Sequence, residues 1–143
     1  MRVIALIVGL GLLAVGFVLG GRVSYALNVE TLIIVVGGAL SFTYVAHRGA
    51  LWRALGLGFL GQTADAGTYT ECAHVLQTLR RVFMATGITL AFIGGINMSV
   101  GLDDPATFGP AFAVLLLAPF YGVVFAELLV MPAMRRLEAQ ARS

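Results

Sequence analysis

Residues 82–100 form an uncharged apolar stretch that constrains the possible folds of this chain more than any other feature. As a helix rising about 1.5 Å per residue, the stretch is long enough to cross a hydrocarbon core of about 30 Å. A second apolar stretch, 111–132, follows a short turn that contains Asp103, Asp104 and Pro105. Adjacent carboxylates are costly in hydrocarbon, so the turn must lie in water or among lipid headgroups. The pattern predicts a transmembrane helical hairpin.

The composition also indicates a membrane protein. The mean hydropathy is +0.96, 59% of the residues are hydrophobic and 11% are charged, a balance that soluble domains do not show. Two more apolar runs, at about 3–20 and 31–46, bring the predicted spans to four. We therefore expect one all-α integral membrane domain over residues 1–143. The net charge of +2 does not indicate binding to nucleic acid.

Residues 47–81 form the sizeable polar segment between the second and third spans. A short helix is predicted in its first half, lying on the membrane surface through an apolar face made of Leu51, Trp52, Leu55 and Phe59.

The second half of this segment predicts an extension of the third helix. Thr68 and Glu71 have the spacing of a capping box, which predicts a helix start at Thr68. Nothing in the sequence interrupts that helix before Gly101. The third helix should therefore extend beyond the bilayer on the side of the polar segment.

The distribution of arginines predicts the orientation. All nine cationic residues are arginines, and only Arg22 falls in the loop between the first two spans. Cytoplasmic loops are enriched in Lys and Arg, so both termini and the segment 47–81 are predicted to be cytoplasmic, with Asp103 and Asp104 outside. The eight arginines on the predicted cytoplasmic side are Arg2, Arg48, Arg53, Arg80, Arg81, Arg135, Arg136 and Arg142.

Small residues mark predicted helix contacts. One stripe recurs at four-residue spacing along the third span, where small side chains allow helix backbones to approach closely in lipid. A glycine pair inside the second span is interpreted in the same way and not as a phosphate-binding loop. These predicted packing residues are Gly87, Ala91, Gly95 and Ser99, together with Gly37 and Gly38.

Few residues in the apolar stretches can carry chemistry. Glu127 is the carboxylate inside one of them, and an intramembrane acid is a candidate proton carrier or vestibule charge. The alternative is a plain carboxylate near the cytoplasmic end of its helix. Thr86, Thr89 and Asn97 are further candidates to face a pore or a partner, and Pro119 frees a backbone carbonyl one turn earlier. No residue spacing predicts a catalytic, cofactor or metal site, so we do not expect an enzyme.

Two segments resemble a known family. The run 101–114 with Phe120-Tyr121-Gly122 and Met131-Pro132, and the upstream run 32–40 (Leu-Ile-Ile-Val-Val-Gly-Gly-Ala-Leu), are similar to the MotA/TolQ/ExbB proton-channel family. Within that family they most resemble MotA-type stator subunits, with a much reduced cytoplasmic region.

The resemblance implies a subunit of a proton-driven rotary channel in the bacterial inner membrane. Five copies would surround a dimer of a separate single-helix partner similar to MotB, ExbD or TolR. That partner would supply the proton-carrying aspartate, and no cofactor is implied.

The sequence also departs from the family pattern. The hydroxyl pair expected before Phe-Tyr-Gly is replaced by Ala118 and Pro119, a pore-facing Thr corresponds to Ala91, and a Pro of the third helix corresponds to Met84. Two alternatives therefore stay open: a non-conducting scaffold that clamps partner helices, and a small four-helix transporter that uses Glu127.

Overall fold

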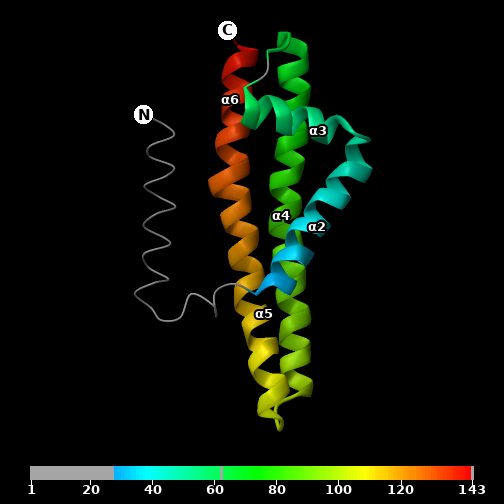
Figure 1. Ribbon diagram of the computed structural model, residues 1–143, viewed down its shortest axis with the longest axis vertical. Helices are drawn as coiled ribbons and strands as arrows, with labels where there is room; N and C mark the ends of the chain where they lie inside the picture. The colour runs from blue at the N-terminus through cyan, green and yellow to red at the C-terminus, as the bar shows by residue number, and fades with distance from the viewer. Residues whose placement is uncertain (1–27, 62, 143) are drawn as a thin grey trace.

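The computed structural model describes residues 28–61 and 63–142. Its longest helix, α4 (Ala66–Val100), runs antiparallel to a continuous helix made of α5 (Pro105–Val123), the π-helical segment η3 (Val124–Val130) and α6 (Met131–Ala141) (Figure 1). No β-strand occurs in the described residues, and the predicted all-α membrane fold is confirmed. Three described helices are long and apolar enough to span a membrane, whereas the predicted span 3–20 lies outside the described residues.

Helix α2 (Val29–His47) leans against this hairpin. The backbone N–H of Asn28 donates to the Tyr121 hydroxyl at 3.1 Å, so α2 begins beside the far end of α5 from the turn. Further along, Gly38 faces Thr86, and His47 hydrogen-bonds Thr78 at 3.0 Å. Helix α2 therefore runs antiparallel to α4.

Two short segments follow α2 and cross the bundle: α3 (Ala50–Leu55) and the π-helical η2 (Gly56–Leu60) (Figure 1). The predicted short helix is thus present, although a π-helical turn completes it where Gly56 and Gly58 weaken the α-helix.

Helix α4 starts earlier than predicted. Its N-cap is Asp65, whose carboxylate accepts hydrogen bonds from the backbone N–H and the hydroxyl of Thr68. The prediction of a start at Thr68 was wrong because Asp65, three residues upstream, caps the helix by accepting from the Thr68 N–H, which leaves Thr68 inside the helix. The hydrogen bond from the Thr68 hydroxyl also lowers the pKa of Asp65. The unbroken run of α4 as far as Val100 is confirmed.

The acidic turn is placed as predicted. Asp104 caps α5 by accepting from the Ala106 N–H at 3.0 Å and from the Thr107 hydroxyl at 2.8 Å. The hydroxyl bond from Thr107 lowers the pKa of Asp104. Pro105, at the first helical position, has no N–H that would need a partner there.

The last helix continues beyond the predicted fourth span. That span was expected at about 111–132, and the chain stays helical to Ala141, with Leu137 completely buried. An interior proline removes one hydrogen bond and crowds the carbonyl four residues earlier. The wider turns of η3 come immediately before Pro132, and the Met131 N–H bonds the Ala126 carbonyl. This π-helical segment carries the helix past the proline.

Candidate functional site

The centre of the hairpin is a contact between two backbones. A β-carbon added at Gly87 would lie 2.7 Å from the Ala118 carbonyl oxygen, and one added at Gly94 would lie 2.7 Å from the Leu115 nitrogen. From the opposite helix, a β-carbon at Gly122 would lie 2.8 Å from the Phe83 oxygen. Any larger residue at these positions would collide with the backbone of the opposite helix, so only glycine fits. Such close backbone contact holds helices together in lipid.

This contact divides the predicted stripe of small residues. Gly87 is buried against α5, but Ala91 and Gly95 are only half-buried and Ser99 is exposed. The nearest atom to a β-carbon at Gly95 would be the Leu115 methyl Cδ1 at 3.7 Å, an ordinary contact. Within the described chain, Gly87 is therefore the buried member of the stripe, and the other three members are partly or fully exposed.

The four-residue count missed Gly94 and Gly122. Two long helices with nearly aligned axes stay in contact at positions that repeat about every 3.5 residues. The buried positions are therefore alternately three and four residues apart. The observed series is Phe83, Gly87, Leu90 and Gly94. A seven-residue interval from Gly87 would have pointed to Gly94.

The other predicted glycines differ from each other. Gly38 faces Thr86 of α4, whose Cγ2 would lie 3.3 Å from an added β-carbon, so it is a packing position. Gly37 is exposed and has no atom of the described chain within 4 Å of such a carbon.

The predicted polar candidates do not share one surface. Thr86 faces α2 and donates to the Val82 carbonyl of its own helix at 2.9 Å. Thr89 and Asn97 are exposed, whereas Pro119 sits at the α4–α5 contact beside Gly87. Within one described chain these residues do not line a channel, and the exposed pair is available only to lipid or to another subunit.

Glu127 has a partner that sequence reasoning did not assign. Its Oε1 accepts from Arg80 Nη2 at 2.6 Å and from Arg80 Nε at 3.0 Å, and both side chains are about one-third exposed (35% for Arg80 and 31% for Glu127). The ion pair joins α4 to η3. Charged groups near hydrocarbon are stabilised by pairing, which explains how a carboxylate is held in an otherwise apolar helix.

The register of the two arms of the hairpin predicts this pair. The turn at 101–104 folds the two arms together, and Arg80 and Glu127 lie at nearly equal distances from it on either side. From the sequence, Arg80 was counted only among the arginines of the predicted cytoplasmic side.

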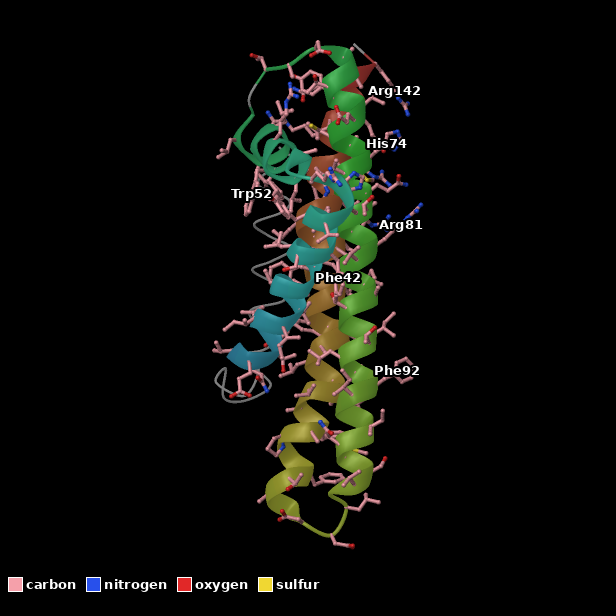
Figure 2. The ribbon with its side chains drawn as sticks, turned by 90° about the vertical axis from the view of Figure 1, so that its right-hand side faces the viewer. Phe42, Trp52, His74, Arg81, Phe92 and Arg142 are labelled. Carbon is pink, nitrogen blue, oxygen red and sulfur yellow. The ribbon has the colours of Figure 1, made fainter. Side chains whose placement is uncertain are left out.

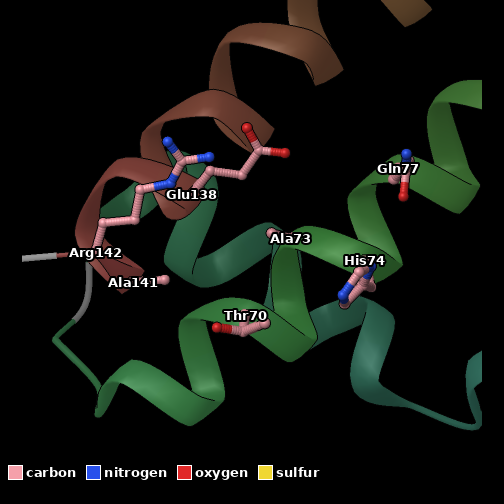
Figure 3. Close-up of a pocket in the computed structure, with 7 residues that line it drawn as sticks. All are labelled: Thr70, Ala73, His74, Gln77, Glu138, Ala141 and Arg142. Carbon is pink, nitrogen blue, oxygen red and sulfur yellow. The ribbon is translucent and has the colours of Figure 1, made fainter.

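The end of the bundle opposite the turn is polar. A hollow of about 350 Å³ opens there between α4 and α6, with His74 and Gln77 on one wall and Glu138 and Arg142 on the other (Figure 3). Thr70, Ala73 and Ala141 complete its lining. Among residues 28–61 and 63–142, no three His, Cys, Asp or Glu side chains lie close enough together to hold a metal ion.

The described arginines lie toward this same end. Arg81 and Arg142 are seen in the half of the bundle that also holds His74, whereas Phe92 lies nearer the acidic turn (Figure 2). The two ends of the hairpin therefore carry opposite charge, as the arginine distribution predicted for the part of the chain that the structure describes.

Comparison with characterised proteins supports the family resemblance. Over 74 residues, 52% of this chain, the sequence is 36% identical to Motility protein A of Aquifex aeolicus. Over 69 residues, 48% of the chain, it is 30% identical to Chemotaxis protein PomA of Vibrio alginolyticus. The chain resembles MotA-type stator subunits. The matched stretches cover 29% and 27% of those two proteins, and no family model matches the chain.

Two residues that depart from the family pattern differ in their burial. Ala118 is completely buried, and its carbonyl oxygen makes the closest approach to Gly87. Ala91 is half-buried.

Proposed function

We propose that this chain is the ring-forming subunit of an ion-driven membrane motor or channel of the MotA type. The observation that carries the proposal is the α4–α5 hairpin, which is closed by glycines inside, in a chain about half of which is similar in sequence to stator proteins. Five copies would surround a dimer of a single-helix partner. We propose no enzymatic role.

The need for a partner follows from the charges. Between residues 82 and 132, Glu127 is the one carboxylate that lies inside the helices of the hairpin, and it forms an ion pair with Arg80. An ion crossing hydrocarbon requires titratable, hydroxyl or water groups along its path, because an isolated charge there is strongly disfavoured. The mid-membrane acid would therefore come from the partner. The pairing of Glu127 also makes the alternative of a transporter built on this carboxylate less favourable.

The proposed setting is the bacterial inner membrane. The arginine-rich end of the bundle, with α6 and the segment 47–81, would face the cytoplasm, and the turn with Asp103 and Asp104 would face outward. Both termini would then be cytoplasmic.

Proton flux tests the conducting role. We expect liposomes holding this chain alone to retain a pH gradient, and liposomes that also hold a single-helix, Asp-bearing partner to lose it. A pH-sensitive dye trapped inside the liposomes reports the internal pH. The control is the same partner with its aspartate changed to Asn. Leakage through the chain alone would contradict the partner-gated mechanism. A complex that assembles but stays closed would assign the scaffold role instead.

Ring assembly tests the outward stripe. Ala91 and Gly95 are partly exposed and Ser99 is exposed, so a neighbouring copy could contact all three. We expect Gly95→Leu to lower the subunit count seen by native mass spectrometry, because a bulky side chain holds helices apart. Gly95→Ala, whose β-carbon meets only a methyl group at 3.7 Å, should keep the ring. An unchanged mass for Gly95→Leu would show that this stripe is not a subunit interface.

A further inference from the structure

The α3–η2 segment (50–60) forms an elbow that joins α2 to the hairpin. Its inner side is buried: Leu51 and Ala54 are completely covered and Leu57 is 2% exposed. An added β-carbon at Gly58 would lie 3.1 Å from a Leu76 methyl and 3.2 Å from Ala133. The elbow therefore packs against both arms of the hairpin, α4 and α6.

The outer side of the elbow is apolar and exposed. Trp52 is 63% exposed, Phe59 48% and Leu60 78%. The prediction that Leu51 shares one membrane-facing surface with Trp52 was wrong, because Leu51 is completely buried. The π-helical turn of η2 changes the number of residues per turn and moves the exposed apolar positions to Phe59 and Leu60.

Two features of this surface select a lipid bilayer over a protein as its partner. The first is continuity: α2 is an apolar span candidate that ends at His47, and α3 begins at Ala50, so the elbow cannot leave the membrane surface. Phe42 and Val45, near the end of α2, are also exposed, so the apolar surface continues from the span toward the elbow.

The second feature is charge. Exposed Arg48 and Arg53 flank Trp52. Tryptophan concentrates at the depth of lipid headgroups, and arginines near a membrane surface are attracted to anionic lipids. A helix that turns across the bundle after a span, with an aromatic outer side and flanking arginines, has the properties of an interfacial helix.

We infer that the outer side of the α3–η2 elbow lies in the headgroup layer of the leaflet at the arginine-rich end, with Trp52 at headgroup depth and Arg53 on anionic phosphate. Because the elbow also packs on α4 and α6, it fixes the depth at which the hairpin sits. The role is independent of ion conduction, and its test does not require the partner.

Trp52 is the single tryptophan of the chain, so its fluorescence reports this surface alone. The full chain is reconstituted in mixed phosphatidylglycerol–phosphatidylcholine liposomes that contain phosphatidylcholine brominated either high or low on its acyl chains. We expect the high bromines to quench Trp52 about twofold more than the low ones, as headgroup depth requires. Quenching by neither lipid would show that another copy or water covers this surface. Equal or stronger quenching by the low bromines would place Trp52 in the hydrocarbon. Either result overturns the inference.

A matched pair of arginine variants tests the anionic contact. Brominated phosphatidylglycerol and brominated phosphatidylcholine are compared at the same mole fraction, and we expect stronger quenching from the anionic lipid. Arg53→Gln should bring the ratio of the two close to one, whereas Arg81→Gln should leave it unchanged, because Arg81 lies on the opposite side of the bundle from Trp52 (Figure 2). An equal effect of both variants, or no effect of Arg53→Gln, would refute a specific contact between Arg53 and phosphate.

Discussion

Alanine at Gly94 is expected to force the two arms of the hairpin apart, whereas alanine at the next residue, Gly95, is expected to be tolerated. A β-carbon at Gly94 would lie 2.7 Å from the Leu115 nitrogen and 3.0 Å from the Ala111 oxygen, and these backbone atoms cannot rotate away. At Gly95 the nearest atom is a Leu115 methyl at 3.7 Å. Overpacking of this kind costs about 1–3 kcal/mol.

The comparison separates the steric effect from helix propensity. Alanine in a helix is favoured over glycine by about 0.5–1 kcal/mol, and both variants gain this term equally. The difference between their free energies of unfolding therefore reports the contact with α5 alone. The measurement is thermal or denaturant unfolding in detergent micelles. Equal stability of the two variants would mean that the arms are not in backbone contact at Gly94.

A second glycine about two turns closer to the middle of α4 makes the same kind of contact. Gly87→Ala would meet the Ala118 oxygen at 2.7 Å, whereas Gly37→Ala meets no atom of the described chain within 4 Å. The two contacts at Gly87 and Gly94 repeat at an interval of seven, so the hairpin is held by a seam and not by one isolated point.

The sequence was sufficient for the hairpin and its turn because these depend on local chemistry. An uncharged run long enough to span lipid, followed by Asp104 and Pro105, allows few folds other than a helical hairpin with a capped second arm. The arginine distribution likewise required only counting along the chain.

The rest depends on how distant residues meet. The seam at Gly94 could not be told from the neighbouring stripe at Gly95 without the relative rotation of α4 and α5. The passage of the last helix through Pro132 required the π-helical turns of η3, which have no simple sequence signature. Predicting the ion pair between Arg80 and Glu127 required the register of the two arms, which is set by the turn at 101–104.

The second prediction with a large expected effect concerns the ion pair between Arg80 and Glu127. Glu127→Gln is expected to lower proton flux through the complex with the single-helix partner several-fold, because it removes the carboxylate that lies inside the apolar stretch of the last helix. The same change leaves Arg80 without its anionic partner. Flux and stability must therefore be measured on the same variants, by dye-monitored liposomes and by unfolding in detergent.

A set of variants at these two positions separates the roles. The double variant Arg80→Gln with Glu127→Gln removes both charges, so a structural tie predicts that it is less destabilised than the sum of the single changes. The expected coupling is about 1 kcal/mol, near the upper end for exposed pairs, because both groups are one-third exposed and screened by solvent. Arg81→Gln, a change at the adjacent and exposed arginine, serves as the control for the loss of positive charge.

The flux of Arg80→Gln decides how the carboxylate acts. If Glu127 transfers protons itself, Arg80→Gln keeps the carboxylate and should reduce flux less than Glu127→Gln does. If the ion pair only holds α4 against η3, both single variants should reduce flux alike, and the exchanged pair Arg80→Glu with Glu127→Arg should restore it. A conducting complex in which Glu127→Gln leaves flux unchanged would remove this carboxylate from the pathway and leave the ions to cross on groups of the partner alone.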